Sequence, residues 1–169
     1  DLLKTISSNF QQYEKIKRHK ISLCENQFLH YTQRIGIHKK YFEKVISELL
    51  FNAFKFSKLE SKIYILIELK QNKLFVSIIN SPEADGSGVY GILPEYSNII
   101  FEPFFRISKL VFESIPTLDF GLGLTVVDKI VRKHQGQIKA FNLISYFDLE
   151  ESEKLDTLVN FEMELPVKE

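Results

Sequence analysis

One stretch of the sequence combines a helical apolar pattern with three polar side chains along a single edge. Apolar residues recur at helical spacing over 38–56, which predicts a helix there. Glu48, Asn52 and Lys55 stand in it at offsets 0, 4 and 7. Because a helix turns about 100° per residue, these side chains fall within roughly 60° of one another. The stretch therefore predicts a helix that packs a core and lines its rim with a carboxylate, an amide and an amine.

This polar stripe has two interpretations. An Asn carbonyl oxygen is a hard ligand for Mg²⁺ and a Lys ammonium suits a phosphate, so Asn52 and Lys55 would fit a nucleotide-phosphate site. Polar residues at this spacing are also common on solvated helix faces, where Glu and Lys compensate each other. The spacing alone favours the solvated face, so the rest of the chain has to decide.

The composition sets the size and class of the fold. The chain has 169 residues, 44% hydrophobic and 26% charged, which suits a single domain over residues 1–169. The formal net charge is zero, so nothing in the charge balance attracts nucleic acid or an anionic membrane. No apolar run approaches the ~20 residues of a membrane-spanning helix. The single cysteine, Cys24, is expected as a buried thiol in a strand and suits a reducing compartment.

The remaining pattern predicts a sheet with helices on one face. A hairpin is expected at 62–70 and 74–79, around a tight turn at Gln71 and Asn72. Helices are expected over 2–18 and 122–134, and further strands over 20–25, 137–141 and 158–165. The Gly- and Pro-containing stretch 81–98 is expected as a long functional loop. This order fits the α/β class, as a two-layer α/β sandwich with a mixed, mostly antiparallel sheet.

A glycine-containing turn stands directly before the predicted helix at 122–134. Gly121 and Gly123 would let backbone N–H groups approach a phosphate closely, and a helix N-terminus favours an anion. A lone Gly-x-Gly more often marks a turn without a ligand. Here the loop before it and the upstream helix with Asn52 and Lys55 favour a phosphate site.

Four blocks, in this order, resemble the ATP-binding catalytic domain of sensor histidine kinases, part of the Bergerat-fold superfamily shared with gyrase and the MutL mismatch-repair proteins. Residues 48–57 resemble the N box, and 74–88 occupy the place of the first glycine box. Phe101-Glu-Pro-Phe-Phe-Arg106 resembles the F box almost letter for letter, and 120–127 resemble the second glycine box. The resemblance extends over about residues 1–165 and implies the Bergerat fold.

The resemblance implies roles for the side chains of the first helix. Asn52 would coordinate a Mg²⁺ that bridges the ATP phosphates, and Lys55 and Phe56 would face the phosphate and sugar end of the nucleotide. Glu48 corresponds to the water-activating base of the ATP-hydrolysing relatives, whereas in a kinase it would polarise or orient.

The resemblance also implies roles for the later blocks. Backbone donors to the phosphates would come from Gly121, Leu122, Gly123 and Leu124. The stretch 107–118 would be the ATP lid, and Phe104 and Phe105 would anchor its near end in the core. For Arg106, contact with phosphate and an idle position on an exposed loop are equally weighted expectations.

The first glycine box departs from the family pattern. The family's adenine-contacting Asp ends the second strand of the hairpin, and that position here is Asn80. An Asp-Gly-Ser-Gly run follows several residues late, from Asp85 to Gly88. Either an insertion lets Asp85 reach the adenine pocket, or Asn80 contacts adenine through its amide oxygen, and the strand register favours Asn80. A neutral acceptor such as the Asn80 amide is weaker than a charged one. With either residue we expect weakened nucleotide affinity.

The resemblance implies an ATP-dependent protein-histidine kinase domain that uses ATP and Mg²⁺. None of the four histidines has the family's phosphoacceptor context, so the acceptor is expected on a separate dimerisation helix or is absent. The implied partners are the dimerisation and phosphotransfer helices of the parent protein and a response regulator, in the cytoplasm. The alternatives are a degenerate, non-catalytic module with weak or no ATP binding and, less favoured, an ATP-hydrolysing relative.

Overall fold

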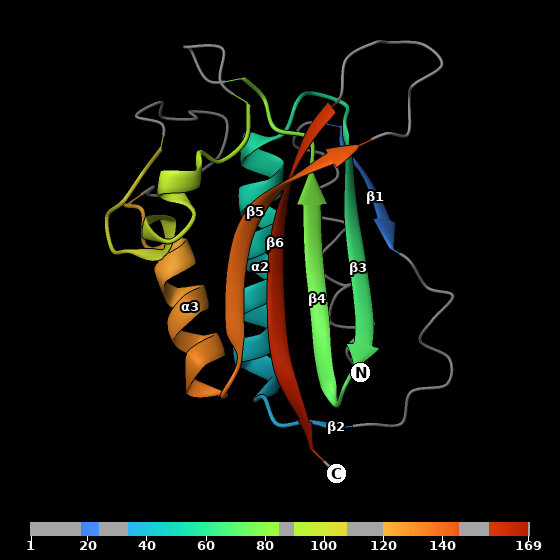
Figure 1. The fold of residues 1–169 in the computed structure, drawn as a ribbon, viewed down its shortest axis with the longest axis vertical. Helices are drawn as coiled ribbons and strands as arrows, with labels where there is room; N and C mark the ends of the chain where they lie inside the picture. The colour runs from blue at the N-terminus through green and yellow to red at the C-terminus, as the bar shows by residue number, and fades with distance from the viewer. Residues whose placement is uncertain (1–17, 24–33, 85–89, 108–119, 146–155, 169) are drawn as a thin grey trace.

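The computed structural model describes residues 18–23, 34–84, 90–107, 120–145 and 156–168 (Figure 1). The elements in chain order are β1 Lys20–Leu23, β2 Arg34–Ile35, α2 Lys39–Phe56, β3 Lys62–Lys70, β4 Lys73–Asn80, the 3₁₀ turns η2 Pro94–Tyr96 and η3 Ile99–Phe101, α3 Gly123–Lys133, β5 Gln137–Ser145 and β6 Asp156–Lys168.

The described strands form one mixed, six-stranded sheet. At its centre β3, β4 and β6 pair antiparallel in that order, and β5 continues on the far side of β6. On the other edge β1 runs parallel to β3. The short β2 pairs with the last residues of β6, where Arg34 lies opposite Lys168.

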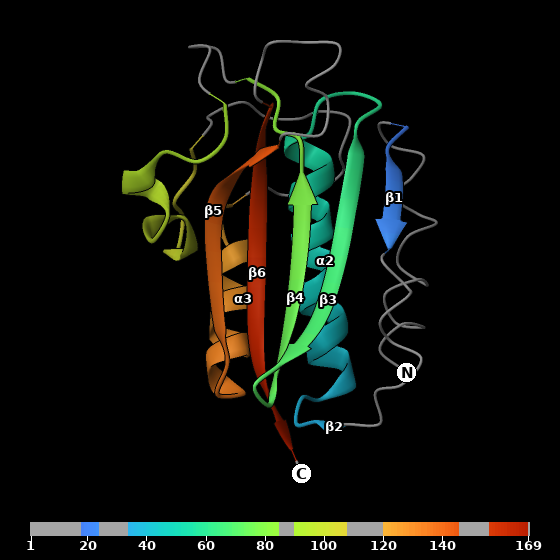
Figure 2. The same ribbon diagram turned by 45° about the vertical axis from the view of Figure 1, so that its right-hand side comes forward.

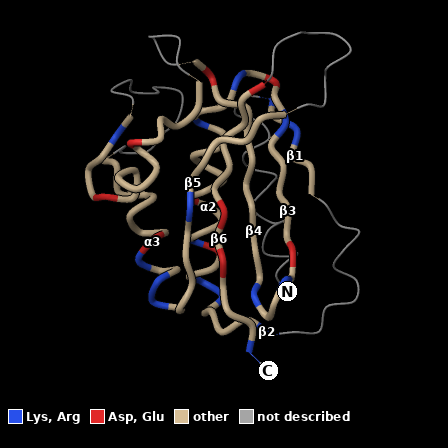
Figure 3. Tube along the Cα trace, in the orientation of Figure 1, with Lys and Arg blue, Asp and Glu red and all other residues tan. Residues whose placement is uncertain are grey.

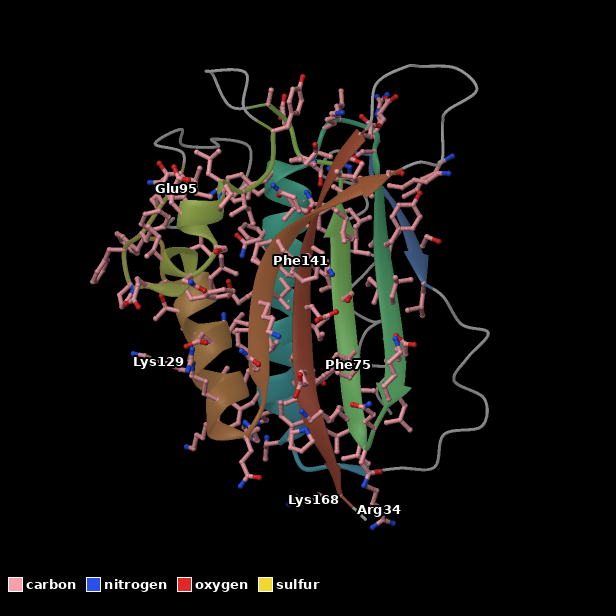
Figure 4. All side chains as sticks on the ribbon, viewed as in Figure 1. Arg34, Phe75, Glu95, Lys129, Phe141 and Lys168 are labelled. Carbon is pink, nitrogen blue, oxygen red and sulfur yellow. The ribbon has the colours of Figure 1, made fainter. Side chains whose placement is uncertain are left out.

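Both described α-helices cover the same face of this sheet (Figures 1 and 2). Successive side chains of a strand point to opposite faces, so the buried Leu74, Val76 and Ile78 of β4 all point towards the helices. The apolar stripe of α2 packs on them with Phe42, Val45, Ile46, Leu49, Leu50, Ala53 and Phe54. Phe75 and Phe141, labelled in Figure 4, lie on the opposite face of the sheet.

The tight turn predicted at Gln71 and Asn72 is confirmed. Both residues have positive φ, 48° and 62°, between the paired strands β3 and β4. Two left-handed residues in a two-residue hairpin loop give the backbone twist that matches the right-handed twist of the strands.

The two-layer α/β architecture is confirmed, and the element bounds differ from the prediction in a few places. The helix expected over 38–56 begins one residue later, because His38 is its N-cap and its Nδ1 accepts from Lys40 N at 3.3 Å. β5 and β6 are both longer than predicted, because each extends along the other until Ser145 lies opposite Asp156. The expected loop 81–98 contains the short 3₁₀ turn η2.

Some sequence predictions lie outside the described residues, namely the helix over 2–18 apart from its last residue and the strand position of Cys24. None of the described helices is long and apolar enough to cross a membrane. Basic and acidic residues are interspersed along the described trace (Figure 3).

Candidate functional site

Two of the predicted site segments end at the same end of the sheet. There α2 ends at Phe56 and β4 ends at Asn80, whereas α3 begins at Gly123 beside Glu48, in the middle of α2 (Figure 1). The backbone of the segment after α2 is tied to the segment after β4, because Lys58 N donates to Ser81 O at 3.0 Å and Glu83 N donates to Phe56 O at 2.8 Å. These two backbone hydrogen bonds therefore fix the end of α2 relative to the end of β4.

The polar stripe of α2 lies partly at the surface and partly in the core. Glu48 and Asn52 are half-buried, whereas Lys55 is only 5% exposed. The Lys55 ammonium lies 4.9 Å from the centroid of the Phe56 ring, and Phe56 itself is 39% exposed. A cation over an aromatic face is attracted by the electron-rich centre of the ring. In this conformation the aromatic ring therefore holds the positive charge of Lys55 at the end of α2.

Glu48 is held on both sides. One turn earlier on α2, Lys44 Nζ donates to Glu48 Oε1 at 2.5 Å. On the other side, a Cβ built on Gly123 would lie 2.5 Å from Glu48 Oε2, so the carboxylate packs directly against the start of α3. A side chain at residue 123 would therefore have to displace the carboxylate from this position. The pairing with Lys44 offsets the negative charge that Glu48 would otherwise bring to a phosphate site.

The start of α3 retains backbone donors that no cap satisfies. Its N-cap is Leu122, whose side chain makes no capping hydrogen bond. The first N–H groups of a helix have no partner within the helix, and their dipoles favour an anion. Leu122 is 39% exposed and Leu124 is half-buried. These backbone N–H groups are therefore available in principle to an anion.

The end of the F box lies against Gly121. Phe104 N donates to Gly121 O at 3.1 Å. Gly121 has φ 68°, and a Cβ there would lie 2.8 Å from Phe105 O and 3.2 Å from Arg106 Cγ. Arg106 is half-buried at this contact. Only glycine meets both demands, a left-handed backbone and a close approach.

The prediction that both phenylalanines anchor in the core is wrong for Phe104. Its side chain is 73% exposed, because its backbone has φ 66° as it turns towards Gly121. Phe105 is half-buried against the core, with its ring centroid 5.6 Å from that of Tyr96.

Asn80 is buried at the end of β4. It is 2% exposed, on the helix-facing side of β4 at its last residue. Its Nδ2 donates to Ser57 Oγ at 2.9 Å, and Ser57 Oγ in turn donates to Ala53 O. The alternative adenine contact, Asp85, and the glycine predicted beside it, Gly88, lie outside the described residues.

A match to a family model covers residues 38–169, and the family is described as histidine kinase-, DNA gyrase B- and HSP90-like ATPases. The chain belongs to this family.

Histidine kinases are among the relatives of this ATPase domain. Histidine protein kinase SaeS of Staphylococcus aureus is 28% identical over 131 residues, which cover 78% of this chain and 35% of that protein. The chain thus spans about a third of the length of the curated relatives it matches. Among solved structures, the catalytic domain of histidine kinase ThkA has a TM-score of 0.69 at 23% identity, covering 98% of this chain and 91% of that one. Full-length ShkA in complex with AMPPNP has a TM-score of 0.66 at 15% identity, covering 98% of this chain and 29% of that one.

These matches confirm the predicted resemblance to a sensor histidine kinase ATP-binding domain and its Bergerat-type α/β fold. Within this ATPase domain, the sequence interpretation missed three side chains that organise the site, Lys44, Ser57 and Asn142. The Asn142 side chain on β5 forms two hydrogen bonds with the backbone of Ile92. Its Oδ1 accepts from Ile92 N at 2.9 Å, and its Nδ2 donates to Ile92 O at 2.9 Å. A polar residue in an otherwise alternating strand was the available signal for Asn142, and an i, i+4 Lys–Glu pair was the signal for Lys44.

Proposed function

We propose that this domain binds Mg²⁺-ATP along α2, between the end of β4 and the start of α3, and delivers the γ-phosphoryl group to a histidine on a separate dimerisation helix. Two observations carry the proposal: the buried amide of Asn80 is hydrogen-bonded to Ser57 at the end of α2, and the uncapped start of α3 packs against Glu48, one turn before Asn52. The domain would act in the cytoplasm, with a response regulator as the next acceptor.

The start of α3 would hold the phosphates. Gly121, Leu122, Gly123 and Leu124 would offer backbone N–H groups to phosphate oxygens, in the manner of other helix N-termini. Lys55 and Arg106 would add positive charge, Lys55 after its side chain leaves the Phe56 ring. Phe56 is exposed and would contact the sugar.

The residues present fit a Mg²⁺ ion that is held together with its nucleotide. The Asn52 amide oxygen is a hard ligand on the half-buried part of α2. Within the described ranges no group of three or more His, Cys, Asp or Glu could hold a metal by itself. Mg²⁺ commonly takes few protein ligands and completes its octahedron with phosphate oxygens and water. Bound in this way, the ion would neutralise charge on the phosphates.

Glu48 would orient the site. Its carboxylate is paired with Lys44 at 2.5 Å and packed against Gly123, which suits a fixed structural charge better than a base that must receive a proton. In phosphoryl transfer most of the catalysis comes from positioning and electrostatic stabilisation. The acceptor imidazole nitrogen would form the new P–N bond while the bond from phosphorus to the ADP oxygen breaks. The imidazole would then lose its remaining N–H proton to water.

One observation favours a second candidate, a non-catalytic regulatory module with weak nucleotide binding. At the position where the family has an Asp, this chain carries the buried, neutral Asn80. A neutral acceptor bonds an adenine amine less strongly than a carboxylate does.

Calorimetric titration with Mg²⁺-ATP tests the proposed binding. We expect micromolar affinity that falls about tenfold or more in Asn52→Ala, because a charge-bearing contact to the bound ion is lost. The matched control is Asn98→Ala, which removes the same amide from an exposed position before η3 and should leave the affinity unchanged. Absence of heat at millimolar nucleotide would exclude the kinase proposal. Binding without phosphate transfer to the parent's dimerisation helices would favour the regulatory module.

A further inference from the structure

We infer that Ser57 determines which purine base the site accepts, by fixing the direction in which the Asn80 amide points. The inference rests on the proposed function, in which Asn80 contacts the base. It assigns a specificity role to a serine one residue beyond the end of α2.

Three groups form a chain of hydrogen bonds with one direction. Asn80 Nδ2 donates to Ser57 Oγ at 2.9 Å, and the Ser57 hydroxyl donates to the backbone oxygen of Ala53. All three residues are buried, with 2% exposure for Asn80, 0% for Ser57 and 1% for Ala53. Ala53 lies in the last turn of α2, four residues before Ser57, which is the spacing at which a serine hydroxyl reaches a helix carbonyl.

This series of hydrogen bonds distinguishes the Nδ2 group of Asn80 from its Oδ1 atom. A serine hydroxyl has one proton, and here Ala53 O receives it, so Ser57 Oγ faces Asn80 as an acceptor. If the Asn80 amide were turned over, its Oδ1 would face the serine oxygen, and two buried acceptors would lie against each other. Ser57 therefore holds Nδ2 on its own side and directs Oδ1 the other way. No residue in the described part of the chain donates a hydrogen bond to Oδ1.

An amide held in this direction offers the base an acceptor only. The exocyclic amine at C6 of adenine is a donor and would pair with Oδ1, whereas the C6 carbonyl of hypoxanthine or guanine would oppose it. Sites with fixed polar groups discriminate strongly against ligands that leave those groups unpaired. Without Ser57, the amide could turn over and offer Nδ2 to a C6 carbonyl. The selectivity for adenine thus depends on a residue that need not touch the base.

The test compares three nucleotides that differ at C6 of the base. The Mg²⁺ complexes of ATP, inosine triphosphate and purine riboside triphosphate carry an amine, a carbonyl and a hydrogen there. We expect the wild-type chain to bind them with decreasing affinity in the order ATP, purine riboside triphosphate, inosine triphosphate. In Ser57→Ala we expect inosine triphosphate to gain about fivefold to tenfold, ATP to lose a few-fold, and purine riboside triphosphate to stay unchanged.

Two further variants separate the direction of the amide from a general loosening of the pocket. In Ser57→Ala combined with Asn80→Asp, the carboxylate has no donor to turn towards a carbonyl, so the gain for inosine triphosphate should vanish. Ser77→Ala is the matched control, because Ser77 also accepts from an Asn amide, that of Asn160 at 3.5 Å, but on the other face of the sheet. It should leave all three affinities as in the wild type. If circular dichroism shows Ser57→Ala unfolded, Ser57→Cys replaces it, since a thiol is a weak hydrogen-bond donor of similar shape.

The outcomes distinguish the inference from the proposed function. A wild-type chain that prefers ATP, with an unchanged ratio of ATP to inosine triphosphate affinity in Ser57→Ala, would overturn the role of Ser57 and leave ATP binding in place. A parallel loss of affinity for all three nucleotides would also overturn it. A wild-type chain that binds none of them would remove both proposals.

Discussion

At the residue scale, the contact between Glu48 and Gly123 joins the two helices of the proposed phosphate site. The Glu48 carboxylate occupies the space that a side chain at residue 123 would need. The backbone of Gly123 lies outside the positive-φ region, so alanine would be acceptable there on backbone grounds. The steric conflict that a larger residue would meet at position 123 therefore comes from the carboxylate of the neighbouring helix.

The effect of Gly123→Ala on the free energy of unfolding should therefore have opposite signs with and without the Glu48 carboxylate. In the wild-type background we expect a destabilisation of about 1 kcal/mol, because the new methyl group displaces the half-buried carboxylate. In a Glu48→Ala background the same substitution should stabilise the fold by about 0.4–1 kcal/mol, as Gly→Ala does at compatible positions. Urea unfolding of the four variants in the double-mutant cycle measures both values. Equal effects in the two backgrounds would contradict the contact.

Single residues also show how far sequence interpretation reaches at this scale. The spacing of Glu48, Asn52 and Lys55 correctly placed them on one helix, because helical geometry is local. It did not predict that Lys55 is buried and lies over Phe56, since burial depends on elements far away in the chain. The exposure of Phe104 was missed for the same reason, because the left-handed turn there follows from a hydrogen bond to Gly121.

At the element scale, the segment that follows residue 89 is fastened to β5 by one side chain. Asn142 makes two hydrogen bonds of 2.9 Å to the backbone of Ile92. Gly91 beside it has φ 83°, and a Cβ there would lie 2.5 Å from Asn142 Oδ1. The amide thus replaces a strand partner for a segment that forms no strand of its own.

Asn142→Ala should release this segment. We expect a loss of about 1–3 kcal/mol, since it leaves both backbone groups of the half-buried contact unpaired. Hydrogen exchange at the Ile92 amide should quicken more than exchange at the centre of β4, and mass spectrometry of peptides can compare them. Asn142→Asp keeps the acceptor for Ile92 N but loses the donor, so it should fall between wild type and alanine. Unchanged exchange at Ile92 in the alanine variant would show that other contacts hold the segment.

Elements with a strong local period were the best predicted. The helix at Lys39–Phe56 and the hairpin of β3 and β4 follow patterns that the sequence shows directly. The extra length of β5 and β6 was missed because it comes from pairing between them, with Asn142 opposite Val159 and Ser145 opposite Asp156. Pairing between strands that are distant in sequence leaves little trace in the local pattern.

At the scale of the whole molecule, the proposed ligand groups come from α2, from β4 and from α3, all of which pack in one sheet-and-helix unit. The strands and α2 supply a common core, in which Leu49, Ile65 and Met163 are fully buried. A ligand bound to these groups would contact several elements that share this core. Its binding should therefore stabilise the whole fold and not only a loop.

Thermal unfolding should respond to nucleotide accordingly. At Mg²⁺-ATP a hundredfold above the dissociation constant, we expect a gain of about 2.7 kcal/mol and a corresponding rise in Tm. Chelation of Mg²⁺ by EDTA should remove most of the gain, since Asn52 would act through the ion. The Asn52→Ala variant should show a smaller rise at the same nucleotide concentration. An equal rise with and without Mg²⁺ would exclude the proposed role of the ion.

The two-layer architecture could be predicted from the order of helices and strands, and the site from four short blocks in a fixed order. The direction of the Asn80 amide could not, because it depends on a serine proton and a helix carbonyl that meet only in the folded chain. A sequence shows which side chains recur at a fixed spacing. Which group donates and which accepts in a series of hydrogen bonds can be seen only in the folded structure.

The hydrogen bond from Phe104 N to Gly121 O, at 3.1 Å, has a consequence for how this fold can vary. It joins the chain on the two sides of 108–119, and both of its partners lie outside that range. In general, lengthening a loop between fixed ends is inexpensive, because each doubling of its length costs only about 0.6 kcal/mol. Related proteins could therefore exchange segments of different length and composition at this point, and alter what the domain meets while its core stays the same.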